Sequence, residues 1–157
     1  MVMLKQVKYC LALGVLICLV AGCASAPKPA KVSLNLVASN SVNPDLEGRP
    51  SPVVVQIYRI RAADAFNNAR FFELYDDAEQ VLGQDLVGVT EIEMSPDSNR
   101  TLSVEGMTAD TRYIGVLAAY RDIDEARWRA IVETPSGEKL DFQVALDALS
   151  VVVTSDD

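Results

Sequence analysis

The sequence predicts a mainly β protein, an antiparallel β-sandwich of about eight strands with a short helical insertion after strand two. Short segments rich in branched aliphatic and aromatic residues recur along the chain, separated by turn-forming residues, and several alternate apolar with polar positions. Only residues 62–82 repeat their apolar side chains at helical spacing instead. Regularly spaced short strands around one helical insertion are typical of a sandwich.

The N-terminal segment has the pattern of a signal peptide. Lys5 and Lys8 precede an apolar run over residues 9–21, which is shorter than the roughly 20 residues that a helix needs to cross a bilayer. This length favours a cleaved signal peptide, residues 1–22, over a retained anchor helix. Small residues directly before Cys23 are typical of bacterial lipoprotein signals, so Cys23 is predicted to carry lipid as the first mature residue.

Residues 23–31 are small and contain prolines, which predicts a short extended tether between the lipid and the domain. The second mature residue is Ala24 rather than Asp, and by resemblance to the lipoprotein sorting rule this favours the outer membrane, with the domain facing the periplasm. No disulfide is expected in the mature chain, because Cys10 and Cys18 lie in the signal peptide and the sulfur of Cys23 is used by the lipid.

The predicted β-sandwich domain covers residues 32–157. Its first strand, residues 32–39, alternates apolar with polar positions. Residues 40–51 hold turn-forming residues and several prolines without apolar periodicity, so we expect a long ordered loop. The second strand, residues 53–58, is apolar on both faces, which predicts a central position in its sheet.

The helix over residues 62–82 is expected to end at Gly83 as its C-cap. The aromatic cluster of residues 71–75 is interpreted as packing that caps one end of the sheet core. Trp128 is also predicted to be core, and the Pro135-Ser136-Gly137 turn predicts a hairpin. The remaining strands are predicted at residues 86–93, 100–104, 112–121, 127–134, 140–146 and 149–154.

The composition excludes several classes of chemistry. There is no histidine, so Ser-His-Asp and Cys-His catalysis and the commonest zinc sites are excluded. Without the signal peptide the chain has 12 basic and 22 acidic residues, a net charge of −10. Nucleic acid and anionic lipid head groups are therefore poor partners, whereas a basic partner stays open.

Two groups of carboxylates were considered as acid–base or calcium sites: Asp76-Asp77 and residues 122–125. Neither has the spacing of an EF-hand, and neighbouring acidic residues are usually solvated. The sequence therefore predicts a non-catalytic binding or structural subunit without a metal or cofactor.

Three stretches together resemble a known family. They are residues 36–58 with Gly48-Arg49-Pro50-Ser51-Pro52, residues 66–86 with Phe71-Phe72-Glu73-Leu74-Tyr75, and residues 115–129 with Ala119-Tyr120-Arg121-Asp122. Their order and spacing, together with the lipoprotein signal, are similar to the outer-membrane lipoprotein of type VI secretion systems, TssJ.

This resemblance implies a transthyretin-like β-sandwich that anchors the trans-envelope complex of TssM and TssL to the outer membrane. In the family the loop between the first two strands binds the periplasmic C-terminal domain of TssM. Here the loop maps onto residues 40–51, whose prolines lower the entropy cost of docking. The implied partner-binding residues are Asn43, Pro44, Asp45, Gly48, Arg49 and Pro50.

Other interpretations stay open. The loop could simply close the sandwich. The chain could be a pilotin-like lipoprotein that assists the assembly of an outer-membrane channel. It could also be a cell-wall enzyme that uses a carboxylate such as Asp77 or Asp122, although the absence of histidine counts against this.

Overall fold

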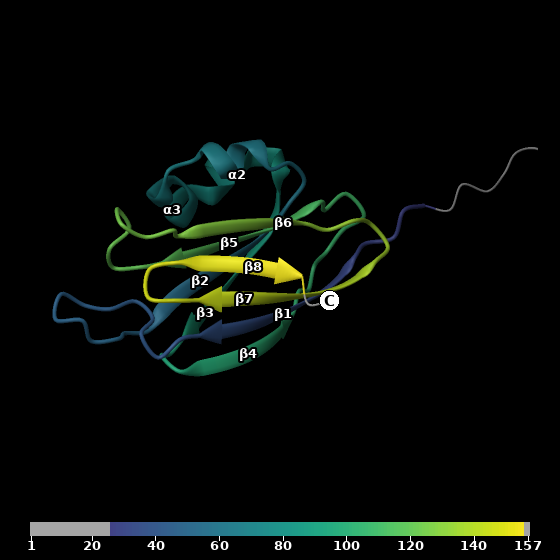
Figure 1. The fold of residues 1–157 in the computed structure, drawn as a ribbon. Coiled ribbons are helices and arrows are strands. Elements are labelled where there is room, and N and C mark those ends of the chain that lie inside the picture. The colour runs from purple at the N-terminus through teal and green to yellow at the C-terminus, as the bar shows by residue number, and fades with distance from the viewer. Residues whose placement is uncertain (1–25, 156–157) are drawn as a thin grey trace, which may run out of the picture.

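The computed structural model describes residues 26–155, which form eight strands and two helices in one sandwich (Figure 1). The signal peptide and Cys23 lie outside these residues. The helical elements are α2 (Asp64–Asn68), α3 (Phe71–Leu82) and a 3₁₀ turn, η1 (Gly83–Asp85). The strands are β1 (Lys31–Ala38), β2 (Val53–Ile60), β3 (Leu86–Met94), β4 (Ser98–Ser103), β5 (Tyr113–Ala119), β6 (Arg129–Glu133), β7 (Lys139–Leu146) and β8 (Val151–Ser155).

The strands form two four-stranded sheets, in the orders β4-β1-β7-β8 and β3-β2-β5-β6. The mainly β class, the eight strands and the helical insertion after strand two are confirmed. Two details of the prediction are wrong. Strands β1 and β7 pair in parallel, whereas the other pairs are antiparallel. Residues 135–137 do not form a hairpin, because β6 and β7 belong to different sheets.

Both differences have one cause. The chain crosses from one sheet to the other between β6 and β7, and a strand that enters a sheet by a crossover is not forced to run antiparallel to its neighbours. Local turn residues such as Gly137, at φ 80°, mark where the chain reverses. They carry no information about which sheet the next strand joins.

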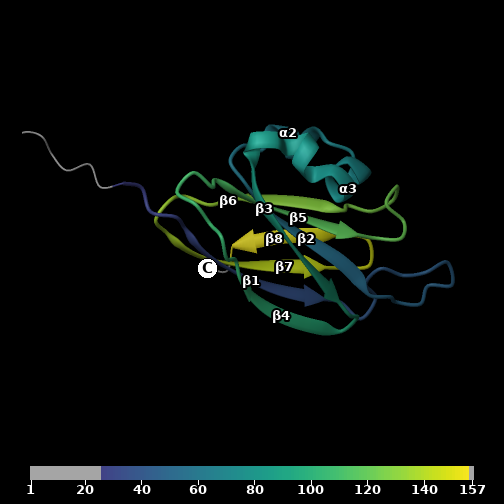
Figure 2. The ribbon, with the colours of Figure 1, turned by 180° about the vertical axis from the view of Figure 1, so that it is seen from behind.

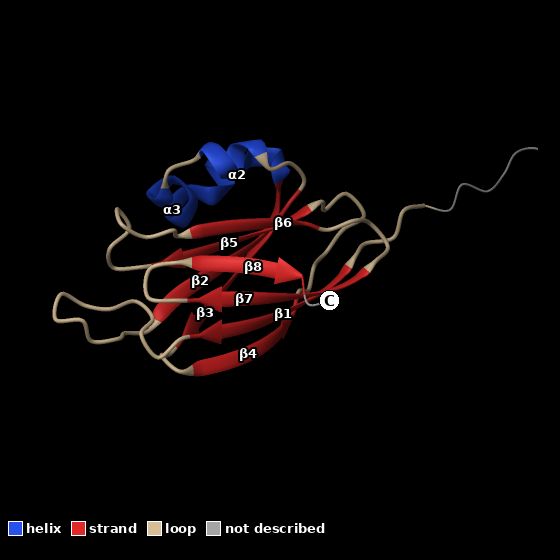
Figure 3. Cartoon of the chain, viewed as in Figure 1, coloured by secondary structure: helices blue, strands red, loops and turns tan. Residues whose placement is uncertain are grey.

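The helical insertion packs on the outer face of the β3-β2-β5-β6 sheet (Figure 2). Figure 3 shows the helices gathered on one side of the sandwich. Gly83 ends α3 at a positive φ of 51°, as predicted. The predicted place of the aromatic cluster at an end of the core is wrong: Phe71 and Leu74 are buried against the sheet face, and Phe72 is 61% exposed.

Two apolar cores result, one between the sheets and one beneath the helices. Strand β2 contributes side chains to both cores, since Val55 and Ile57 face the sandwich interior whereas Tyr58 and Ile60 face the helices. This confirms its predicted central position. Trp128 is half-buried and packs against both cores.

The tether and the β1–β2 loop lie at opposite ends of the sandwich (Figure 1). Residues 26–30 enter β1 at one end, and the strand delivers the chain to the loop at the other end. Among the described residues, no helix is long and apolar enough to cross a membrane.

Candidate partner-binding site

Asn43 fastens the base of the β1–β2 loop to the sandwich. Its backbone adopts the left-handed conformation, with φ 49°, which Asn tolerates better than most residues. The side-chain amide donates to the carbonyl of Pro52 at 2.6 Å and accepts from the backbone N–H of Arg121 at 2.8 Å. Its own N–H donates to the carbonyl of Ala148 at 3.0 Å. The side chain of Asn43 therefore joins the two ends of the loop and ties them to the connection after β5, and its backbone N–H ties the loop to the connection before β8.

Asp45 organises the tip of the loop. Its Oδ1 accepts the backbone N–H groups of Glu47 at 3.0 Å and Arg49 at 2.9 Å, and its Oδ2 accepts from Nε of Arg49 at 2.7 Å. The hydrogen bond from the Arg49 backbone, above all, holds the pKa of Asp45 below its usual value. Gly48 has φ 78°, which lets the chain turn back beneath this network. The tip is therefore ordered by its own side chains.

This network presents Leu46 to solvent. The side chain of Leu46 is fully exposed, at 104% of its reference area. An exposed leucine is not remarkable by itself, but this one stands at the apex of a loop that is fixed at its base and its tip. The loop therefore holds one apolar group in a defined position.

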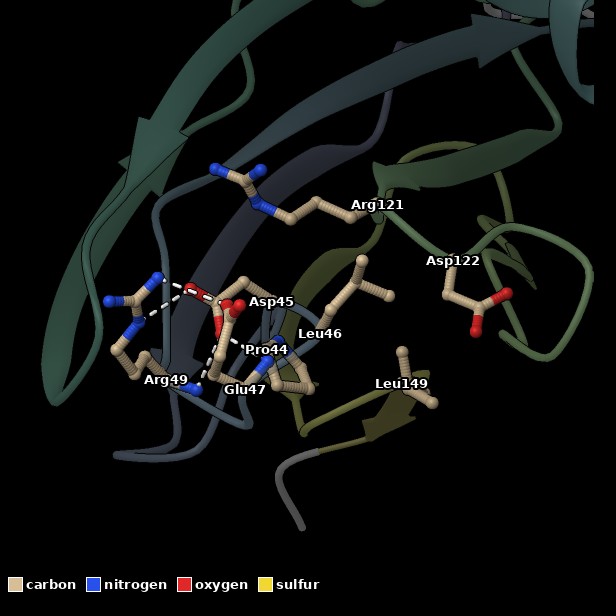
Figure 4. Close-up of a pocket in the computed structure, with 8 residues that line it drawn as sticks. All are labelled: Pro44, Asp45, Leu46, Glu47, Arg49, Arg121, Asp122 and Leu149. Atoms are coloured by element: carbon tan, nitrogen blue, oxygen red, sulfur yellow. Dashed lines mark hydrogen bonds and ion pairs between the residues drawn. The ribbon is translucent and has the colours of Figure 1, made fainter.

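Leu46 also borders an open hollow of about 550 Å³ (Figure 4). The opposite wall comes from the connections after β5 and before β8, which supply Arg121, Asp122 and Leu149. The hollow thus joins loop segments that lie far apart in the sequence. Its complete lining is Pro44, Asp45, Leu46, Glu47, Arg49, Arg121, Asp122 and Leu149.

Charged groups surround this apolar centre. The guanidinium of Arg49 forms ion pairs with the carboxylates of Asp45, at 2.7 Å, and Glu47, at 3.1 Å. Arg121 is exposed and forms no ion pair within residues 26–155, and Asp122 is exposed beside it. An apolar centre with a charged rim is the usual composition of a protein-binding surface.

The structure separates the six predicted partner-binding residues into two groups. Asn43 is only 3% exposed and both ends of its amide are engaged inside the protein, so its role is to hold the loop. The other five are half-buried or exposed and lie at the tip: Pro44, Asp45, Gly48, Arg49 and Pro50. Whether they contact a partner stays a prediction, and Cys23 lies outside the described residues.

Leu46 and the opposite wall of the hollow were not predicted from the sequence. A lone leucine in a turn-rich segment without apolar periodicity was an available signal, because such a residue has no neighbour with which to form a core. The wall formed by Arg121, Asp122 and Leu149 had no comparable signal, since only the tertiary fold brings it to the loop.

The two candidate carboxylate groups, Asp76-Asp77 and residues 122–125, are not brought together by the fold. Asp122 lines the hollow at the β1–β2 loop, whereas Asp77 lines a separate hollow beside α3. Across residues 26–155, no three His, Cys, Asp or Glu side chains are grouped so that they could hold a metal ion.

Residues 30–149 match the family described as type VI secretion lipoprotein, VasD, EvfM, TssJ. Among solved structures, the chain is similar to the type VI secretion lipoprotein TssJ1 from Pseudomonas aeruginosa, with 30% identity and a TM-score of 0.79 over 82% of this chain and 98% of that one. It is also similar to Lip from Serratia marcescens, a membrane-bound component of the type VI secretion system, with 27% identity and a TM-score of 0.73 over 82% and 99% of the two chains.

A third structure, of the type VI secretion protein TssM C-terminal domain from EAEC, contains a chain of the same fold. The identity is 20% and the TM-score is 0.63, over 78% of this chain and 99% of that one. Among curated proteins, no match to the chain was found.

Proposed function

The chain belongs to the type VI secretion lipoprotein family, and from this premise we propose that it anchors a trans-envelope secretion complex to the outer membrane by binding the periplasmic C-terminal domain of TssM. The complex in this proposal also contains TssL. The role is mechanical and non-enzymatic, and it involves no nucleic acid, small-molecule substrate or cofactor.

The arrangement of the two ends of the domain supports this role. Lipid on Cys23 would hold the tether at the inner face of the outer membrane. The β1–β2 loop lies at the far end of β1, a strand of 8 residues that spans about 26 Å at 3.3 Å per residue. A binding site there faces away from the membrane and into the periplasm, where TssM would approach.

Leu46 is the observation that carries the proposed contact. An exposed apolar side chain on an ordered loop can enter a pocket of the partner with little further loss of backbone conformational entropy. Burying such a side chain contributes about 1.5–3 kcal/mol. The Arg121 and Asp122 side chains beside the hollow would then set the orientation of the partner more than its affinity.

The choice of TssM as partner has two supports. The first is the sequence resemblance to TssJ, in which this loop binds TssM. The second is that a structure of the TssM C-terminal domain contains a chain with this fold. Both support a partner in the secretion complex.

Calorimetric titration tests the proposal directly. The soluble domain, residues 24–157, is titrated with the periplasmic C-terminal domain of TssM from the same genome. Saturable binding is expected for the unmodified domain and loss of binding for a variant in which residues 43–50 are replaced by a Gly/Ser loop. Leu46→Ala removes three carbon atoms, and at about 0.8 kcal/mol for each buried CH₂ it is expected to weaken binding by roughly 50-fold.

Val89→Ala is the matched control, since Val89 is also an exposed apolar residue but lies on β3, away from the loop. Equal affinities for Leu46→Ala and Val89→Ala would move the contact to another part of the sandwich. Complete absence of binding in the unmodified domain would reject TssM as the partner and return attention to a pilotin-like role.

Cys23→Ser tests the membrane part of the proposal. This variant is expected to fold but to be absent from the outer-membrane fraction and to abolish secretion, because its N-terminus cannot be acylated. Normal secretion by Cys23→Ser would contradict the anchoring mechanism.

A further inference from the structure

The two most exposed large apolar side chains of residues 26–155 lie toward the same end of the sandwich. One is Leu46 on the β1–β2 loop, and the other is Phe72 in the first turn of α3. The ring of Phe71, the neighbour of Phe72, lies 5.3 Å from the ring of Trp128. Trp128 stands where β5 ends, since its carbonyl accepts the backbone N–H of Ala118, and β5 ends beside the first residues of β2. Figures 1 and 2 both show α3 toward the end from which the β1–β2 loop projects.

Phe72 is held in place by a cluster of aromatic rings. Its ring meets the ring of Phe71 edge to face, with the centroids 5.1 Å apart. Phe71 is buried, stacks on Tyr75 at 5.4 Å and packs edge to face against Trp128. Phe72, Tyr75 and Trp128 are exposed or half-buried, and we call them the aromatic patch. Aromatic rings offer a large apolar area and lose little side-chain entropy when a partner covers them.

The connection between β5 and β6, residues 120–128, joins the aromatic patch to the hollow at the loop. The backbone N–H of Arg121 donates to the side chain of Asn43 at the loop base, and Asp122 lines the hollow. The next residue, Ile123, packs against the core beneath the helices. The loop, the hollow and the aromatic patch are therefore neighbours along one end of the domain.

A partner that binds the loop has to cover more than the hollow. A stable interface takes about 800 Å² and roughly 20–30 residues from each partner, whereas eight residues line the hollow. On its other side the loop base meets the β3–β4 connection, where the N–H of Asp97 donates to the carbonyl of Ser39, but residues 95–97 are Ser, Pro and Asp. Among the surfaces that adjoin the hollow, the aromatic patch offers the largest exposed apolar side chain. Aromatic side chains are enriched at the centre of protein interfaces.

We propose that the partner of the β1–β2 loop also binds the aromatic patch, with Phe72 inserted into an apolar pocket of that partner. This contact rests on the proposed function, in which the partner is the periplasmic C-terminal domain of TssM. It gives the helical insertion a function of its own, because α3 then presents a second apolar anchor beside Leu46. Two anchors in fixed positions define the orientation of the partner, which one anchor cannot do.

Calorimetric titration of the soluble domain, residues 24–157, with the TssM domain tests this contact. Because 61% of Phe72 is open to solvent and can be covered, Phe72→Ala is expected to weaken binding about 10-fold. The matched control is Gln80→Ala, which also truncates an exposed side chain of α3, but in the last turn of the helix. The affinity of Gln80→Ala should equal that of the unmodified domain.

The double variant Leu46→Ala/Phe72→Ala separates a direct contact from an effect on the loop. Two independent contacts multiply in their effects on affinity, so this variant should bind roughly 500-fold more weakly than the unmodified domain. If Phe72 acted only by shifting the loop, Phe72→Ala would add nothing to Leu46→Ala. That result would overturn the proposed contact.

Fluorine NMR detects the contact without removing the side chain. The chain has four phenylalanines, so labelling with 4-fluorophenylalanine gives four resonances, and the resonance of Phe72 is identified by its loss in Phe72→Leu. Saturation with the TssM domain should shift the Phe72 resonance, whereas the resonance of Phe142, buried in the core between the sheets, should not move. An unshifted Phe72 resonance at saturation contradicts the contact. This measurement also decides the matter if Phe72→Ala proves too unstable to titrate.

Failure of this contact can be told apart from failure of the proposed function. If Leu46→Ala weakens binding but Phe72→Ala and Gln80→Ala bind equally well, the patch contact is rejected and TssM remains the partner of the loop. Absence of binding by the unmodified domain would reject TssM as the partner, and the patch contact with it.

Discussion

Replacing Asn43 by Ala should destabilise the whole domain rather than affect only partner binding. The substitution removes the amide that donates to the Pro52 carbonyl and accepts the Arg121 N–H, and it leaves a non-glycine residue without local hydrogen bonds at φ 49°. The loop base would then lose its side-chain links to Pro52 at the other end of the loop and to Arg121 after β5, and keep only the backbone hydrogen bond to Ala148. Asn43 was predicted from the sequence as a partner-binding residue, so this experiment separates that interpretation from a structural role.

The magnitude follows from three contributions. Each of the two partly buried backbone groups loses its partner, at about 1 kcal/mol or more for each. The left-handed conformation costs an alanine roughly 1 kcal/mol more than it costs a residue suited to it. The free energy of unfolding should therefore fall by about 3 kcal/mol. In a domain of this size that corresponds to roughly 12 °C in Tm.

Urea denaturation of residues 24–157 measures this change, and the fluorescence of Trp128, the only tryptophan, reports unfolding because its side chain packs against both cores. Asn43→Gly should recover about 1 kcal/mol relative to Asn43→Ala, since glycine tolerates positive φ but cannot restore the amide contacts. The control is Asn68→Ala, in which an exposed asparagine loses one local hydrogen bond, with an expected change within about 0.5 kcal/mol. The reasoning is refuted if Asn43→Ala unfolds at the same urea concentration as the unmodified domain.

Three further predictions concern packing and pH. A Cβ at Gly115 would lie 2.6 Å from the ring of Phe66, so Gly115→Ala should lower stability by about 1–3 kcal/mol and lower Tm in calorimetry; an unchanged Tm would contradict this. The buried Oγ1 of Thr134 has no hydrogen-bond partner among residues 26–155, so Thr134→Val should raise the urea midpoint by the equivalent of about 1 kcal/mol, and a lower midpoint would show that the hydroxyl is satisfied. The folded-state pKa of Asp45 lies below its unfolded value of about 3.9, so its contribution to loop order is present above that pH and is lost as the pH falls through the folded pKa. Hydrogen exchange at the Arg49 backbone amide should therefore be slower in the unmodified protein than in Asp45→Asn at pH 6. This difference should vanish at a pH below the folded-state pKa of Asp45. A difference that does not change with pH would contradict the role of the ionised Asp45 carboxylate.

Local pattern was enough to predict the elements of this fold. Period-two alternation in residues 32–39 identified β1, and the apolar character of both faces of residues 53–58 identified β2 as a central strand. The helical spacing and Gly83 located the insertion and its end, although the break between α2 and α3 at Ala69 and Arg70 was missed. Such features depend on residues that are close together in the sequence, so the sequence alone is enough to predict them.

The candidate site was predicted less completely. Turn residues and prolines identified residues 40–51 as one ordered loop, and the resemblance to TssJ pointed to it as a binding segment. Residue type alone could not distinguish Asn43, whose amide faces inward, from Asp45 and Arg49 at the tip of the loop, because all three are polar residues of the same segment. Orientation depends on which backbone groups meet each side chain, and the amide of Asn43 meets the carbonyl of Pro52 and the N–H of Arg121, which is far away in the sequence.

By itself the sequence showed that this chain has no histidine, and it predicted a lipoprotein signal, about eight short strands and an ordered loop after the first of them. Only the tertiary structure decided that β1 pairs in parallel with β7, that the helices cover the β3-β2-β5-β6 sheet, and that Leu46 is fully exposed in the β1–β2 loop. The physical reason is that periodicity records which face of a segment is apolar, whereas the partner of that face is fixed by contacts between residues far apart in the chain. Exposure, pairing direction and the walls of a hollow are properties of those distant contacts.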